Sequence, residues 1–153
     1  MSVTKNDRRN AYLYCKFRDD QYACYDKYAK QHGMSMNMLL IVNALYYAKE
    51  GLTQREICDI THESKQTVNL NIKALLAENS VTVAEIPTNK RMKVVMLTET
   101  GRQKYKKPIT HITRSEDTAM SLLTSEEQEI LIELSRRFTK DLIRLIDGED
   151  VNK

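Results

Sequence analysis

The stretch that decides the fold runs from Leu52 to Leu97 and reads LTQREICDITHESKQTVNLNIKALLAENSVTVAEIPTNKRMKVVML. Its first part predicts a short helix, because Thr53 and Glu56 form a T-x-x-E capping box in which each side chain satisfies a backbone N–H. A second helix is predicted to begin at Ser64, after a polar link of three residues. The apolar face of the first helix is expected to include Ile57 and Ile60.

The second helix has two different faces. Its apolar residues recur at the spacing of one helical face and are Val68, Ile72, Leu75 and Leu76. The opposite face carries side chains that can donate hydrogen bonds, namely Lys65, Gln66, Asn69 and Lys73. A capped helix, a short turn and a second helix with a buried back are the pattern of a helix-turn-helix, whose second helix reads DNA.

A β-hairpin is predicted directly after these helices. Val81, Val83 and Ile86 indicate one strand, and Met92–Leu97 indicates its partner. The loop Pro87–Arg91 between them is rich in turn residues and has a basic tip. A hairpin in this position is a wing, so we expect a mainly α (α+β) fold, a winged helix-turn-helix over residues 35–97 with a two-stranded wing. A further short strand near Gly51-Leu52 could close the wing sheet.

Helices are predicted on both sides of this core. Residues of about 7–31 read as one long helix, and Ser35 is a plausible N-cap for a helix from Met36 to about Lys49. Thr98 is the expected N-cap of a later helix, which Pro108 should kink or break. Thr124 and Glu127 form another capping box, followed by an amphipathic stripe of Ile130, Leu131, Leu134, Phe138, Leu142, Leu145 and Ile146.

Length and composition limit the class of protein. A chain of 153 residues with 41% hydrophobic residues predicts one domain, residues 1–153, with a core. No apolar run approaches the roughly 18 residues of a membrane span, and no signal region follows the charged N-terminus. Three cysteines without a C-x-x-C motif argue against a disulfide framework, so we expect a cytoplasmic protein. The net charge is only +3, but basic residues gather from Lys90 to Lys107 while the C-terminal part is acidic.

These features resemble the MarR-type winged-helix transcription regulators. The matching pieces are Ser64-Lys65, Thr67-Val68, Leu75, Val81, Arg91, Leu97-Thr98 and Gly101-Arg102. The sequence departs from the family pattern at Leu70, where Arg is frequent, and at Asn71, Asn79-Ser80 and Asn89. The resemblance implies a homodimeric DNA-binding regulator, most simply a repressor of a pseudo-palindromic operator, whose helices at residues 7–31 and 99–147 form the dimer.

Two sets of residues are assigned on this basis. The expected DNA contacts are Thr53, Gln54, Ser64, Lys65, Gln66, Thr67, Asn69, Lys73, Asn89, Lys90 and Arg91. Amides such as Gln66 and Asn69 can read adenine edges, while lysines more often hold phosphates. The expected dimer contacts are Leu13, Phe17, Leu131, Leu134, Phe138, Leu142 and Leu145.

Other functions stay open at this point. Winged helices also serve as protein-interaction modules without DNA contact. A peroxide-sensing subgroup of the family uses a cysteine in its first helix, where this chain has Cys15 among several tyrosines. Those tyrosines could instead line a pocket for a small aromatic ligand that releases the protein from DNA. The histidines His32, His62 and His111 are widely spaced, so no metal or other cofactor is expected, and the absence of a catalytic motif predicts that the chain is not an enzyme.

Overall fold

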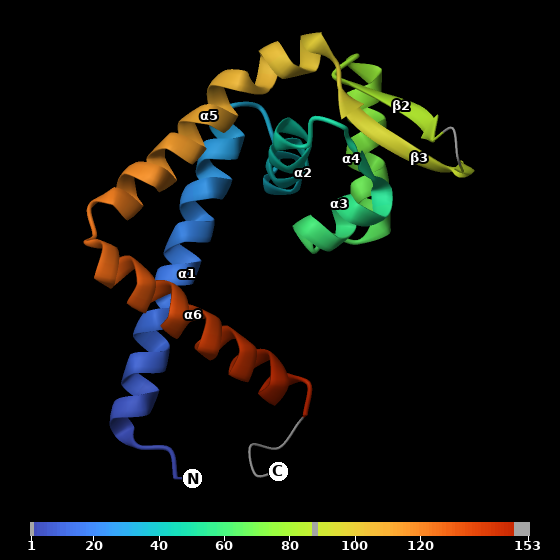
Figure 1. The fold of residues 1–153 in the computed structure, drawn as a ribbon. Coiled ribbons are helices and arrows are strands. Elements are labelled where there is room, and N and C mark those ends of the chain that lie inside the picture. The colour runs from blue at the N-terminus through green and yellow to red at the C-terminus, as the bar shows by residue number, and fades with distance from the viewer. Residues whose placement is uncertain (1, 87–88, 149–153) are drawn as a thin grey trace. The chain divides into compact units, whose positions relative to one another are not determined.

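The computed structural model describes residues 2–86 and 89–148, and at residues 86 and 89–91 it describes the backbone alone. The chain runs through helix α1 (Lys5–Gln31), α2 (Met36–Tyr47), strand β1 (Leu52–Thr53), α3 (Gln54–Thr61) and α4 (Lys65–Ala77). Strands β2 (Val81–Ile86) and β3 (Asn89–Leu97) and helices α5 (Glu99–Ser121) and α6 (Ser125–Ile146) follow (Figure 1). This order confirms the mainly helical winged helix-turn-helix with flanking helices. The chain divides into two compact units, residues 1–109 and 110–153.

The first unit is organised around α2, which contacts α1, α3, α4 and β3 (Figure 1). Its fully buried side chains include Ile41, Val42 and Leu45 on α2, Ile57 on α3, and Val68 and Leu75 on α4. Burial of one such side chain contributes about 1.5–3 kcal/mol to folding. The predicted buried face of α4 is therefore confirmed at Val68, Ile72 and Leu75.

Two residues predicted on these apolar faces are instead exposed. Leu76 keeps 40% of its surface in contact with solvent, because it lies about 100° around α4 from the buried Leu75. Ile60 lies in the last turn of α3 and is also exposed. The expectation that both belong to the core is wrong.

The helix starts predicted from capping residues are confirmed. The Thr53 hydroxyl oxygen accepts a hydrogen bond from the Glu56 N–H (3.2 Å), and the Glu56 carboxylate accepts one from the Thr53 N–H (2.7 Å). Ser64 caps α4 by accepting from the Thr67 N–H (3.1 Å), and Ser35 caps α2 in the same way. Such a cap stabilises a helix by about 1 kcal/mol. These caps fix where the helices begin and hence which residues stand at their N-terminal ends.

The three strands form an antiparallel sheet in the order β1-β3-β2. Leu52 pairs with Val95, and Val95 pairs on its other side with Val83. The short strand expected near Gly51-Leu52 therefore closes the wing sheet as β1. Gly51 has a φ of +77°, and a Cβ there would lie 2.6 Å from the Val95 carbonyl oxygen, so this approach of β1 to β3 requires glycine.

The C-terminal end of α4 closes in a Schellman motif. Asn79 adopts a left-handed conformation with a φ of +57°. The Asn79 N–H donates to the Leu76 carbonyl (3.0 Å), and the Ser80 N–H donates to the Leu75 carbonyl (2.8 Å). Asparagine here takes the role that glycine has in most such motifs.

The L-T-x-x-G-R segment, residues 97–102, runs from the end of β3 into α5. Its hydrogen bonds connect the start of α5 to the backbone that follows α4. Thr98 is the N-cap, as predicted, since its hydroxyl oxygen accepts from the Gly101 N–H (2.9 Å). The Thr98 N–H donates to the Ser80 carbonyl (3.0 Å), and the Thr98 hydroxyl donates to the Asn79 carbonyl (2.6 Å). Arg102 donates to the Tyr46 carbonyl in the last turn of α2 (3.0 Å), and its guanidinium lies 5.2 Å from the centre of the Tyr46 ring.

Of the kink or break expected at Pro108, the break does not occur, because α5 is one helix from Glu99 to Ser121 with the proline inside it. Proline removes a single backbone N–H, and the hydrogen bonds of the neighbouring turns remain. Pro108 is buried, and its carbonyl accepts a hydrogen bond of 3.3 Å from the Tyr28 hydroxyl on α1. Pro108 therefore belongs to the contact between α5 and α1.

The second unit contains the end of α5, a tight turn and α6. Thr124 and Glu127 form the predicted capping box, with the Thr124 N–H donating to the Glu127 carboxylate at 2.8 Å. The Gln128 amide donates to the Met120 and Leu123 carbonyls and closes the turn. No described residue of α6 is buried.

Across the described ranges of the chain, no helix has the combination of length and apolar character needed to cross a bilayer.

Candidate nucleic-acid interface

The outward surface of α4 carries four of the residues predicted to contact DNA. Lys65, Gln66, Asn69 and Lys73 are all exposed. Among the described residues, neither Lys65 nor Lys73 pairs with a carboxylate. Both ammonium groups are therefore available for an external anion. This surface lies away from the buried Val68, Ile72 and Leu75.

Two other predicted residues, Ser64 and Thr67, are occupied by the helix start. The Ser64 hydroxyl caps α4 and lies 2.9 Å from the half-buried Thr67 hydroxyl. Thr53 is similarly engaged in the capping box of α3. Their structural role is thus to orient the N-terminal ends of α3 and α4, where partial positive charge favours anions.

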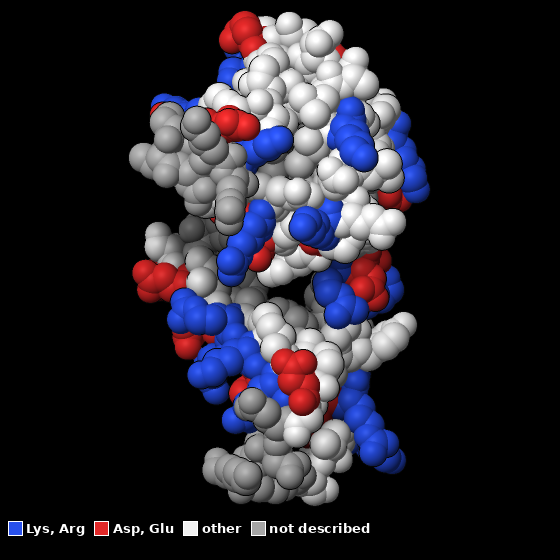
Figure 2. All heavy atoms as spheres, turned by 90° about the vertical axis from the view of Figure 1, so that its right-hand side faces the viewer, with Lys and Arg blue, Asp and Glu red and all other residues white. Residues whose placement is uncertain are grey.

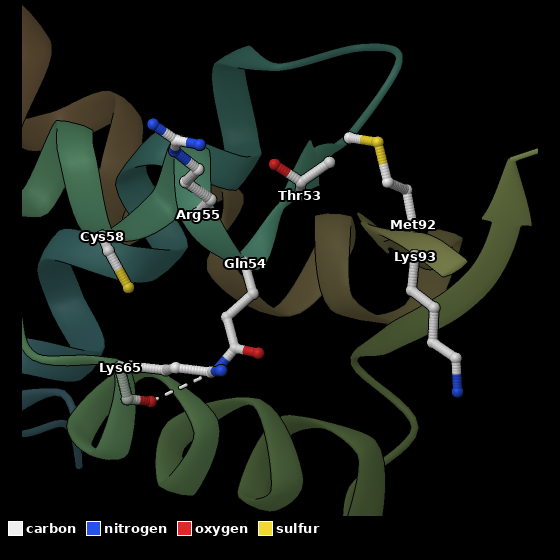
Figure 3. A pocket seen from close by; sticks show the side chains of 7 residues that line it. All are labelled: Thr53, Gln54, Arg55, Cys58, Lys65, Met92 and Lys93. Atoms are coloured by element: carbon white, nitrogen blue, oxygen red, sulfur yellow. Dashed lines mark hydrogen bonds between the residues drawn. The ribbon is translucent and has the colours of Figure 1, made fainter. Parts of the chain in front are cut away.

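Gln54 connects the two helices of the helix-turn-helix. Its side-chain amide donates a hydrogen bond of 3.1 Å to the Lys65 carbonyl in the first turn of α4 (Figure 3). From the sequence, Gln54 was expected to contact a DNA phosphate. In the structure its side-chain N–H₂ group instead donates a hydrogen bond within the protein. Gln54 therefore fixes where α4 begins relative to α3.

An open hollow of about 720 Å³ lies beside this contact, between the starts of α3 and α4 and strand β3. Figure 3 shows Gln54 reaching from α3 toward the first turn of α4, with Met92 and Lys93 on β3 nearby. Three basic residues are among its lining, which consists of Thr53, Gln54, Arg55, Cys58, Lys65, Met92 and Lys93. Arg55 and Lys93 are not among the DNA contacts expected from the sequence, because no local pattern shows that they share a hollow with Lys65.

The wing tip was predicted to supply Asn89, Lys90 and Arg91. The backbones of these residues belong to β3, but their side chains lie outside the described part of the structure. Their contact with DNA stays a prediction.

The basic run identified in the sequence is only partly available for an anion. Arg102 is bound to the Tyr46 carbonyl, and Lys104 forms an ion pair of 2.6 Å with Glu78. On the face shown in Figure 2, the described Lys and Arg side chains form separate groups among acidic and uncharged atoms. The free cations that remain on the winged helix include Lys65, Lys73 and Lys93.

The residues assigned to a dimer lie on the terminal helices. On α1, Leu13 and Phe17 are exposed, and on α6 Leu131, Leu134 and Leu145 are exposed while Phe138 and Leu142 are half-buried. The structure therefore leaves an apolar surface on each of these helices.

The sensor alternatives can also be located. Cys15 is half-buried on α1, Cys24 is exposed, Cys58 is half-buried at the hollow, and all three are free thiols. Within the described residues, no three His, Cys, Asp or Glu side chains come together as a metal-binding group.

No family model matches the sequence, and no curated protein matches it as a relative. Solved structures do match along nearly the whole chain. AbsC, a MarR family transcriptional regulator from Streptomyces coelicolor, is 17% identical, with 93% of this chain and 97% of that one covered at a TM-score of 0.77. NMB1585, a MarR family regulator from Neisseria meningitidis, is also 17% identical, with 97% and 100% covered at a TM-score of 0.73.

A third structure is MepR from Staphylococcus aureus in complex with DNA, which is 21% identical, with 92% of this chain and 98% of MepR covered at a TM-score of 0.66. Identities this low establish the fold rather than a shared activity. The order of elements, the wing sheet and these matches agree, so the chain has the winged-helix fold of MarR family transcriptional regulators.

Proposed function

We propose that this protein is a homodimeric, sequence-specific DNA-binding transcription regulator, most simply a repressor. The observation that carries the proposal is the two-sided character of α4. Its back is anchored by the buried Val68, Ile72 and Leu75, while its front presents exposed amides and ammonium groups. A helix of this width fits the major groove of B-DNA. Gln66 and Asn69 would read base edges, and Lys65 and Lys73 would hold phosphates.

The hollow beside α4 supports the same orientation on DNA. Arg55, Lys65 and Lys93 come from three different elements and border one concave surface. A DNA backbone running across this surface would meet cations together with the N-terminal ends of α3 and α4. Wing residues Asn89, Lys90 and Arg91 would then contact the neighbouring minor groove or its phosphates.

The dimer is supported by the apolar surfaces of α1 and α6. Leu134 keeps 54% of its surface exposed, and several neighbours on α6 are similarly uncovered. A second copy of the chain is the simplest cover, because two-fold pairing buries the same surface on both partners. Two winged helices related in this way match a pseudo-palindromic operator.

A salt titration tests the proposal. We expect a labelled random-sequence duplex to bind at low salt, with an affinity that falls linearly in log–log form as salt rises. The double variant Lys65→Ala/Lys73→Ala should reduce that slope by about 2, the number of phosphate contacts removed. A charge-matched control is Arg137→Ala/Lys140→Ala, which removes two exposed cations from α6. Unchanged binding in the α4 variant would contradict the assigned interface.

The alternative of a protein-interaction module predicts no binding to duplex DNA in this titration. It also predicts that Lys65 and Lys73 are ordinary surface charges. Release by a small aromatic ligand near the tyrosines of α1, a thiol switch at Cys15 and the absence of enzymatic activity remain predictions of the sequence, and none of them is needed for the DNA-binding proposal.

A further inference from the structure

Leu70 is an apolar residue in the middle of the polar surface of α4. Its side chain is 69% exposed, although it is a large aliphatic group. Leucine in such a position leaves hydrocarbon in contact with water, which is unfavourable unless something covers it. Single exposed leucines are common, so the position of Leu70 on the helix decides whether its exposure has meaning.

The position is the centre of the outward face. Successive residues of an α-helix are about 100° apart, which places Leu70 almost diametrically opposite the buried stripe of Val68, Ile72 and Leu75. Gln66 lies one turn before Leu70 and Lys73 lies one turn after it, and both are exposed. Leu70 is therefore flanked along the helix by the groups proposed to contact DNA.

A helix docked in the major groove directs the centre of its outward face at the groove floor. Most chemical groups on that floor are hydrogen-bond donors or acceptors, which a leucine cannot satisfy. The exception is the 5-methyl group of thymine, which is hydrocarbon and projects into the major groove. Contact between this methyl and a leucine side chain removes both from water.

We infer that Leu70 is a specificity-determining residue that recognises the 5-methyl group of thymine in the operator. The inference rests on the proposed DNA binding and adds the class of base read at the centre of α4. Gln66 and Asn69, which both precede Leu70 on the exposed surface of α4, would add hydrogen-bond readout of neighbouring bases. In modified DNA 5-methylcytosine carries the same methyl, so a synthetic duplex without that base isolates thymine as its source.

The test replaces thymine by uracil, which lacks only the methyl. A duplex is first selected from a random-sequence pool by the unmodified protein and is then synthesised with thymidine or with deoxyuridine. We expect the deoxyuridine duplex to bind about fourfold more weakly for each methyl contacted. Substituting one thymine at a time then identifies the base pair that Leu70 contacts.

A matched pair of variants assigns the effect to Leu70. For Leu70→Ala, the duplexes with thymidine and with deoxyuridine at the base pair that Leu70 contacts should bind with equal affinity. Leu76→Ala truncates another exposed leucine on the same helix, on a different side, and should keep the full preference. Because both side chains are exposed, thermal melting of each variant should stay close to that of the unmodified protein.

The outcomes are distinct. Equal affinity of the unmodified protein for the two duplexes would overturn the inference while leaving the DNA-binding proposal intact. A preference for thymine that survives in Leu70→Ala would also overturn it, because another residue would then read the methyl. Failure to bind any duplex at low salt would overturn the proposed function and this inference together.

Discussion

A Cβ atom on Gly101 would lie 2.0 Å from the carbonyl oxygen of Ser80. The first turn of α5 therefore packs directly against the backbone that follows α4, at a distance that only glycine allows. Gly101→Ala should destabilise the protein by about 3 kcal/mol or more, because backbone rather than a flexible side chain must move. This exceeds the roughly 1 kcal/mol that alanine gains over glycine in a helix. Urea unfolding measures the difference.

The matched control for Gly101→Ala is Thr100→Ala, at an exposed position one residue earlier. It should change the free energy of unfolding by no more than about 0.5 kcal/mol. Equal stability of Gly101→Ala and the unmodified protein would show that α5 can move away from Ser80 at no cost, which would contradict a role for this close approach in stability.

Leu75 and Leu76 offer an internal comparison of two adjacent leucines on α4. Leu75 is fully buried and Leu76 is 40% exposed. Leu75→Ala should cost about 2–5 kcal/mol through lost burial and the cavity left behind. Leu76→Ala should cost less than about 1 kcal/mol. Thermal melting of the two variants distinguishes them, and similar losses would mean that the assigned face of α4 is wrong.

Glu78 gives the joint between α4 and α5 a pH dependence. Burial raises the pKa of the Glu78 carboxyl, but hydrogen bonds from Lys104, Tyr105 and Ser80 outweigh it and hold the pKa below its ordinary value of 4.5. Because the pKa is lowered, the charged Glu78 carboxylate stabilises the folded state. This contribution is fully present above pH 4.5 and is lost as the pH falls through the folded-state pKa. The joint should therefore weaken in acid.

Glu78→Gln tests this linkage. The variant should be less stable than the unmodified protein by about 1 kcal/mol or less at pH 7, because the ion pair is partly exposed. The difference should narrow below pH 4.5 and close as the pH falls through the folded-state pKa of Glu78, where the carboxyl becomes protonated in both states. Glu50→Gln, at an exposed position between α2 and β1, serves as the control. A stability difference that is constant from pH 7 to pH 3 would refute the role of the Glu78 charge.

Local signals in the sequence predicted most of the fold, and part of what was missed depends on long-range contacts. The caps at Ser35, Thr53, Ser64, Thr98 and Thr124 each depend on residues within three positions, so reading the sequence was enough. Whether Pro108 would kink or break the helix was left open, because its contact with α1 comes from Tyr28, a residue 80 positions away.

In the candidate site too, the features set by local sequence were predicted and those set by contacts between elements were not. The exposed donors of α4 follow from helical periodicity and were assigned correctly to its surface. The contact of Gln54 with the Lys65 carbonyl and the pairing of Lys104 with Glu78 join separate elements, so the sequence alone assigned these polar groups to external partners or a charged patch. Counting the basic residues of a sequence run therefore overestimates how many cations are available to bind DNA.

Gln66 and Arg91 should act on DNA binding through different physical effects. Gln66→Ala should relax the preference at one base position and cost about 1–3 kcal/mol on the selected duplex, because an amide reads a base edge. Arg91→Ala should weaken binding to all sequences and reduce the salt slope by about 1. Competition titrations with selected and random duplexes separate these effects. Equal losses for Gln66→Ala on both duplexes would rule out base reading by this residue.

The dimer makes the most direct prediction about assembly. The apolar residues of α6, which include Leu131, Leu134 and Leu145, are exposed in the isolated chain, and a patch of this size on a monomer favours association. Two-fold pairing would cover it and would present two α4 helices to half-sites about 34 Å apart, one turn of DNA. Leu134→Asp/Phe138→Asp should therefore give monomers that lose binding to the selected duplex, although Lys65 and Gln66 are intact.

The control variant Ser125→Asp/Thr139→Asp adds the same charge at exposed polar positions of α6 and should remain dimeric. Light scattering measures the mass, and a monomeric unmodified protein at micromolar concentration with full affinity for the selected duplex would overturn the dimer.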